Sequence, residues 1–268
     1  MIVGVDHIAL ACVDLETGQR ALDRLGLSER FVDRAVANAP QKRPLLSDYG
    51  PLHDIAVYDP QSGAAIELTA HNVLQKEARN GFTPVLEVTG PAAAELADPD
   101  GESKCVTAAF GEGFVRHALQ ELDTYCYLRA GHEDSCLRAG VLAVADLEAS
   151  LAFFTSGLAG KTDRQGVENG RRWAVVKLPA LMPKWRLELL LVAAEGAATN
   201  ENFLDNAGWP CLACLTTSIE GDAEKLRQAA ARHVGEIFHL SVNGKALRIL
   251  LAAGPNGELI ELIEISKK

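Results

Sequence analysis

The most constraining feature of this sequence is a short pattern that occurs twice. Residues 8–16 (IALACVDLE) run from an apolar stretch into Asp-Leu-Glu, and residues 141–148 (VLAVADLE) repeat that design. Asp14 and Asp146 are 132 residues apart in a chain of 268. Each Asp stands where a helix N-cap is favoured, and the Glu two residues later favours the helix dipole. A strand leading into a helix, repeated at half the chain length, predicts a duplicated fold.

The pattern extends to four units of about 67 residues each, in an α+β arrangement of the order βαβββ. The polar break at residues 131–135 divides them into two domains, residues 1–130 and 136–268, and the second unit is the least regular. Strands are predicted at 2–12, 29–35, 54–58, 64–70, 82–88, 106–110, 114–120, 123–128, 137–145, 172–178, 185–192, 211–217, 236–242, 246–251 and 259–265, and helices at 14–25, 91–97, 146–156 and 221–233.

Charge and cysteine usage exclude several classes of function. The net charge of −10 and the pI near 5.2 argue against nucleic acid and anionic membranes as partners, because both require a cationic surface. No apolar run approaches the ~18 residues of a membrane span, and no signal peptide is visible. The six cysteines have no framework spacing, so we expect free thiols in a cytoplasmic protein.

Four short motifs resemble the vicinal oxygen chelate superfamily, which includes glyoxalase I, extradiol dioxygenases and bleomycin-binding proteins. They are VDHIAL (5–10), DLE (14–16), AIEL (65–68) and the closing hairpin GPNGELIEL (254–262). The resemblance covers both ends and the third unit, and it is poor over residues 72–130. It implies that the four βαβββ modules pair into two curled mixed-sheet domains, each around a cavity. The four-unit layout is similar to that of extradiol dioxygenases.

The resemblance also implies a divalent metal site, with ligands from the first and last strands of the units. His7 and Glu67 match those positions, and imidazole and carboxylate suit Fe, Mn, Ni or Zn. The matching first-strand positions of the later units fall near Thr83–Pro84, at Ala139 and near Pro210–Cys211, without histidine. Glu67 and Glu261 are the expected catalytic residues, because a carboxylate between apolar neighbours either lines a cavity or faces solvent.

Three further residues are expected to bind the substrate: His53, Tyr125 and Glu188. His53 precedes a strand and has the alternative of a surface loop, and Tyr125 lies near the last-strand position of the second unit. His71 is expected at the surface. Cys211 and Cys214 form a CxxC sequence on a predicted strand, where core packing is the better interpretation.

Two classes of function follow. The first is a metal-assisted enzyme for a small organic metabolite, with lyase, isomerase or ring-cleaving oxygenase chemistry. The missing histidines argue against ring-cleaving oxygenase chemistry. The alternative is a metal-free protein that sequesters a drug or metabolite between paired sheets. The resemblance allows a homodimer, although no surface feature of the sequence indicates one.

Overall fold

The computed structural model describes residues 1–268 except 61, 72–80, 90–100, 131–134, 195–201 and 266–268. The strands are β1 (Ile2–Cys12), β2 (Ser28–Ala37), β3 (Leu52–Asp59), β4 (Ser62–Gly63), β5 (Ala65–Ala70), β6 (Thr83–Val88), β7 (Val115–Leu119), β8 (Thr124–Ala130), β9 (Cys136–Val144), β10 (Lys161–Glu168), β11 (Arg171–Lys177), β12 (Glu188–Ala193), β13 (Gly208–Thr216), β14 (His233–Val234), β15 (Phe238–Val242), β16 (Lys245–Ala253) and β17 (Leu259–Ile265). The helices are α1 (Leu15–Arg24), α2 (Glu102–Phe110), α3 (Leu147–Ala152) and α4 (Ile219–Gln228), with a 3-10 turn at Pro40–Leu45.

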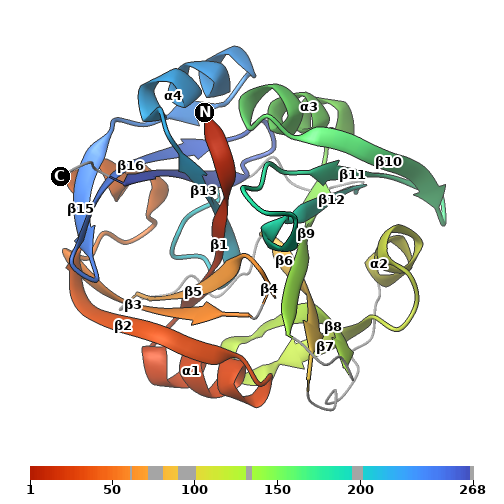
Figure 1. The fold of residues 1–268 in the computed structure, drawn as a ribbon, viewed down its shortest axis with the longest axis horizontal. Coiled ribbons are helices and arrows are strands. Elements are labelled where there is room, and N and C mark those ends of the chain that lie inside the picture. The colour runs from red at the N-terminus through yellow and green to blue at the C-terminus, as the bar shows by residue number, and fades with distance from the viewer. Residues whose placement is uncertain (61, 72–80, 90–100, 131–134, 195–201, 266–268) are drawn as a thin grey trace.

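The described strands form two mixed sheets that lie side by side (Figure 1). Sheet A has nine strands, in the order β14-β16-β17-β13-β1-β5-β3-β2, with β15 paired to β16. Sheet B has eight, in the order β10-β11-β12-β9-β6-β8-β7, with β4 paired to β9. The predicted fold class, α+β with βαβββ modules paired into two mixed sheets, is confirmed. In the described part of the chain, no helix has the length and apolar character needed to cross a membrane.

Each central strand separates two environments because its side chains alternate between faces. In β1, Ile8, Leu10 and Cys12 lie in the main core, whereas His7 and Ala9 face the concave side of sheet A. The main core also holds apolar residues of α1, α3 and α4, which cover the convex faces of the sheets. The Asp14 and Asp146 side chains accept hydrogen bonds from the third residue beyond each of them, at 2.8 and 3.0 Å, which confirms both predicted caps.

The pairing of the units differs from the expected order. β1 pairs antiparallel with β13, and β9 pairs antiparallel with β6. Sheet A therefore combines the first and fourth units, and sheet B combines the second and third with the short β4 of the first, so that neither sheet stays within residues 1–130 or 136–268. The expectation that neighbouring units pair is corrected here. Each unit offers a similar apolar first strand, and local pattern carries no information about which of these edges meet.

Helix α2 corrects the prediction of a strand at residues 106–110. Cys105, Val106, Ala109 and Phe110 are buried at helical spacing, so the short apolar run is one side of a helix. Runs of this length do not distinguish a strand from a buried helix by periodicity. The helix predicted at 91–97 lies outside the described residues.

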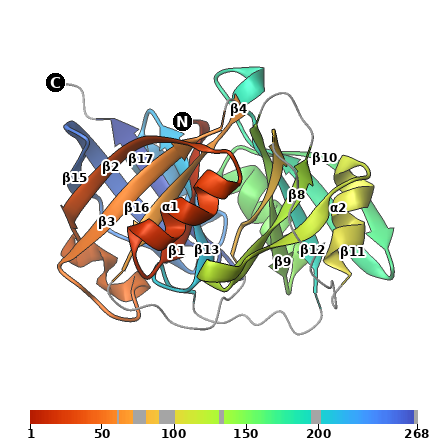
Figure 2. The same cartoon turned by 90° about the horizontal axis from the view of Figure 1, so that it is seen from below.

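The same helix closes the concave side of sheet B. The buried residues of α2 form one cluster with residues of β6, β8, β9, β11 and β12 that point away from the main core. Figure 2 shows α2 against the strands of sheet B, on the side away from sheet A. The hollow of sheet B is therefore filled by the protein itself, whereas none of the four described α-helices packs into the hollow of sheet A, where only Leu45 of the 3-10 turn joins the apolar cluster.

Candidate functional site

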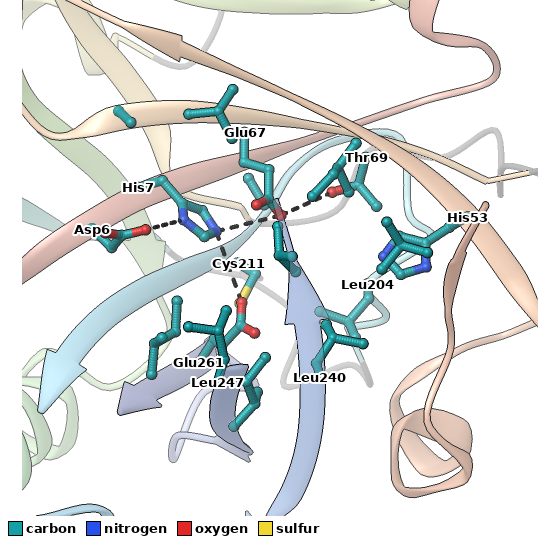
Figure 3. A pocket seen from close by; sticks show the side chains of 18 of the residues that line it. Asp6, His7, His53, Glu67, Thr69, Leu204, Cys211, Leu240, Leu247 and Glu261 are labelled. Atoms are coloured by element: carbon teal, nitrogen blue, oxygen red, sulfur yellow. Dashed lines mark hydrogen bonds and ion pairs between the residues drawn. The ribbon is translucent and has the colours of Figure 1, made fainter. Parts of the chain in front are cut away.

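The concave face of sheet A encloses a cavity of about 160 Å³. Its lining comes from both units of the sheet, and most of it is aliphatic, as at Val36, Ile55, Leu240 and Ile249. A cavity of this size is comparable to apolar cavities that accept a benzene-sized molecule. His7, Glu67 and Glu261 lie together at its centre, where β1, β5, β13 and β17 lie side by side (Figure 3), and other charged side chains, such as Lys42 and Lys245, also line it.

His7 lies at this centre with its two ring nitrogens in different surroundings. Its Nδ1 is 2.9 Å from Oδ2 of Asp6. Its Nε2 is buried and has no hydrogen-bond partner among the described residues, although it is 3.6 Å from Oε1 of Glu67 and 3.8 Å from Oε2 of Glu261 (Figure 3). His7 itself is only 3% exposed. The free nitrogen therefore faces two carboxylates in a place that water hardly reaches.

The acidic neighbours control the charge of His7. Burial alone would lower its pKa, but Glu67, Asp6 and Glu261 outweigh burial and raise the pKa to about 10. Burial also raises the pKa of Glu261, against the influence of Lys42 and His7. Without another cation, His7 is thus an imidazolium that balances the carboxylates around it.

Register shows that the two units contribute equivalent residues. Beside β1, His7 pairs with Ala65 and Ala9 pairs with Glu67. Beside β13, Cys211 pairs with Leu259, and Ala213 pairs with Glu261. Glu261 therefore holds the place in the fourth unit that Glu67 holds in the first, and Cys211 holds the place of His7. The predicted first-strand position near Pro210–Cys211 is Cys211.

Sheet B has none of these groups at the equivalent positions, which are Thr83, Tyr127, Ala139 and Leu190. Glu188, expected to bind the substrate, does not hold the place in sheet B that Glu67 holds in sheet A. Glu188 pairs with Ala139, whereas the residue in the place of Glu67 is Leu190, two residues further along β12. The Oε2 atom of Glu188 accepts a hydrogen bond from Arg164 at 3.0 Å. Sheet B thus lacks both the donor set and the open hollow.

The structure brings together four of the six predicted site residues. His7, Glu67, Glu261 and His53 all line the cavity of sheet A. Tyr125 and Glu188 belong to sheet B, where the Tyr125 hydroxyl is 3.4 Å from Glu102 of α2. Neither residue lines the cavity, because the units that carry them pair with each other and not with the first unit.

The same cavity contains a stacked pair of histidines, of which only His53 was predicted to lie in the site. The rings of His53 and His71 lie 6.1 Å apart, within 9° of parallel, and both are buried. Burial lowers the pKa of both, for His71 to about 4, so they are neutral at physiological pH. Within the described part of the chain, Nδ1 of His53 and Nε2 of His71 have no hydrogen-bond partner. The expectation that His71 is at the surface is wrong; the alternation Glu67, Thr69, His71 could have revealed it.

The residues at the centre fit a divalent metal in chemistry and approximate spacing. Among the described residues, no three His, Cys, Asp or Glu side chains are already grouped closely enough to hold one. However, two atoms that bind one metal at about 2.1 Å each are separated by at most about 4.2 Å. The distances of 3.6 and 3.8 Å from Nε2 of His7 to the two carboxylates are within that limit. Asp6 orients the ring in the way that acidic partners orient metal-binding histidines.

Two curled sheets, each made of two βαβββ units around a hollow, define the fold of the vicinal oxygen chelate superfamily, here in its four-unit form. Among solved structures, glyoxalase I from Zea mays has a TM-score of 0.61 at 17% identity, covering 97% of this chain and 92% of that chain. A proposed dioxygenase from Bacillus subtilis subsp. subtilis str. 168 has a TM-score of 0.61 at 9% identity, covering 99% and 86%. At these identities the likeness shows the fold alone. No family model and no curated protein matches the sequence.

Proposed function

We propose that this protein is a metal-assisted enzyme that acts on a small, largely apolar organic molecule in the cavity of sheet A. One observation carries the proposal: the buried, unpartnered Nε2 of His7 faces Glu67 and Glu261 across 3.6 and 3.8 Å. An unpaired buried donor or acceptor is costly, and such groups cluster at functional sites. A cation between these groups would satisfy all three.

His7, Glu67 and Glu261 would hold the metal, which would supply Lewis-acid polarisation of neighbouring substrate oxygens. Asp6 accepts the Nδ1 proton of His7, so that Nε2 keeps its lone pair toward the site. Glu261, which faces His7 at the centre of the cavity, would also be the carboxylate that accepts and returns a proton of the substrate. The aliphatic walls exclude water and hold the apolar part of the molecule.

The donor set favours proton transfer, and thus isomerase or lyase chemistry, over ring-cleaving oxygenation. Non-haem Fe(II) oxygenases use two histidines and one carboxylate. Here the centre of the cavity offers one histidine, His7, with two carboxylates. Of the other cavity histidines, His53 lies away from His7 (Figure 3), and His71 stacks on His53.

The alternative function is metal-free binding of a small molecule. It is favoured by the neutral His53–His71 pair, which offers two unpartnered ring nitrogens to a ligand without any metal. In that case His7 would remain an imidazolium between its carboxylates, and the site would need no cation.

Metal titration of the purified protein distinguishes the metal-assisted enzyme from the metal-free binding protein. We expect stoichiometric binding of one divalent ion by elemental analysis and calorimetry, and a loss of affinity of more than about 100-fold in His7→Ala. His239→Ala, at an exposed position of β15, is the matched control and should bind as the wild type does. Wild-type protein that binds no divalent ion would refute the metal proposal and leave the binding protein as the better function.

A further inference from the structure

Cys211 lies in the cavity at the position that corresponds to His7. It is 2% exposed and belongs to the apolar cluster on the concave face of sheet A. Figure 3 shows its side chain between His7 and Glu261. Glu261 and Glu67 are close enough to add to the effect of burial in raising the pKa of the thiol.

The neighbouring cysteine of the CxxC sequence has the opposite placement. Cys214 is three residues further along β13 and points into the main core, where it is 1% exposed. The two thiols are both free, both buried and on the same strand, yet only Cys211 lines the cavity. Core packing, expected for both from the sequence, describes Cys214 in the main core, whereas Cys211 packs in the cluster that lines the cavity.

A second observation points to a ligand at this place. Nε2 of His7, in a side chain that is nearly fully buried, has no hydrogen-bond partner among the described residues and faces the same centre, with the two carboxylates at 3.6 and 3.8 Å. Each of the two units that form sheet A therefore delivers one first-strand and one last-strand donor: His7 with Glu67, and Cys211 with Glu261. The four donors comprise one nitrogen, one sulfur and carboxylate oxygens.

We propose that Cys211 is a metal ligand, so that the site is a His–Cys–Glu–Glu centre for a thiophilic divalent ion. The inference rests on the proposed function and names its metal class. When the ion binds, the Cys211 thiol loses its proton to solvent and the sulfur forms the bond to the metal as a thiolate. Thiolate ligands select Zn(II) and Co(II) over Mg(II) and Mn(II), which prefer oxygen ligands.

Cobalt substitution tests the proposal with a signal that does not depend on activity. Co(II) added to the metal-free wild type is expected to give the near-ultraviolet absorption of a thiolate-to-cobalt charge transfer. Cys211→Ser should lose that band and should bind Zn(II) at least about 10-fold more weakly, with little change for Mn(II). Cys214→Ser is the matched control, on the same strand and equally buried, and should keep the band.

A measurement on the wild type alone covers the case in which a cysteine variant does not fold. X-ray absorption of the Zn(II)-loaded wild type should show one sulfur ligand at about 2.3 Å beside nitrogen and oxygen ligands. Co(II) binding without the charge-transfer band, or Zn(II) binding without a sulfur ligand, would overturn the role of Cys211 and leave the proposed metal site intact. Absence of any Co(II) or Zn(II) binding would overturn both.

Discussion

At the residue scale, two buried polar side chains depend on their polar neighbours, His7 in the cavity and Asp222 at the start of α4. His7 receives its orientation from Asp6, which is less buried than His7 and adjacent to it in the sequence. Asp222 of α4, fully buried, is held by Lys225, Thr216 and the amino terminus. A buried charge is stable only when partners of this kind compensate for lost hydration.

Removal of the Asp6 carboxylate is expected to weaken metal binding. In Asp6→Ala, Nδ1 of His7 loses its acceptor, the ring can rotate, and its Nε2 lone pair no longer faces the site. We expect a loss of affinity of roughly 10- to 100-fold, as for other partners of metal-binding histidines. Calorimetry checks this, with Glu16→Gln, an exposed charge removal in α1, as the control. Equal affinities in Asp6→Ala and the wild type would show that Asp6 does not orient His7.

Asp222 is expected to make stability depend on acid pH. Burial would raise its pKa, but hydrogen bonds from Lys225, Thr216 and the amino terminus outweigh burial and lower it. A carboxyl with a lowered folded-state pKa stabilises the protein above its unfolded pKa, and this contribution is lost as the pH falls through the folded value. Asp222→Asn should cost about 2 kcal/mol at pH 7 and less below about pH 4. Urea unfolding at both pH values measures it; a difference from the wild type that grows toward acid pH would contradict the assignment.

At the scale of elements, helix α2 decides that the molecule has one open hollow and not two. α1, α3 and α4 contribute to the main core on the convex side, while α2 packs in the concave side of sheet B. Its Phe110 is buried there, with Arg138 and Arg164 over its ring. The loss of donor residues from sheet B and the filling of its hollow therefore occur together.

Phe110→Ala is expected to lower stability without changing the site. Removal of a buried Phe side chain costs about 3 kcal/mol, through lost transfer energy and the cavity that remains. Because Phe110 packs in sheet B and none of it lines the cavity of sheet A, metal affinity should stay within a factor of about two. Thermal unfolding and calorimetry measure the two effects. A large loss of metal affinity in a folded variant would show that the hollows are coupled.

The whole molecule is held together by pairing between its first and last quarters. β1 and β13 form the centre of sheet A, with His7 opposite Ala213. The site needs both, because His7 and Glu67 come from one unit and Cys211 and Glu261 from the other. The backbone N–H of Phe82 also donates to the carbonyl of Trp209 at 2.7 Å, which connects the second and fourth units.

The chain is therefore expected not to divide into two independent halves. Residues 1–130 alone would expose the whole edge of β1, and residues 136–268 that of β13, and such apolar edges aggregate. Expressed separately, the halves should be insoluble or unfolded by circular dichroism, whereas co-expressed halves should purify together and bind metal. A folded, monomeric 1–130 fragment would contradict the observed pairing as the source of stability.

Local sequence determined much of this protein. The repeated Asp-Leu-Glu pattern correctly located two helix starts, and apolar alternation correctly placed most strands and put His7 and Glu67 on them. An edge strand such as β10, mostly exposed and rich in charge, was missed, since it has little apolar alternation. These helix starts and strands depend on residues that are close together in the sequence, so they can be predicted from the sequence alone.

Tertiary structure decided which units meet, and thereby which residues form the site. Tyr125 and Glu188 lie on well-predicted strands, yet they fall in sheet B because the second unit pairs with the third. Cys211 and His71 lie in the cavity for the corresponding reason, since β13 and β5 flank β1. The choice among similar strand edges depends on packing over the whole core, which no local pattern of residues encodes.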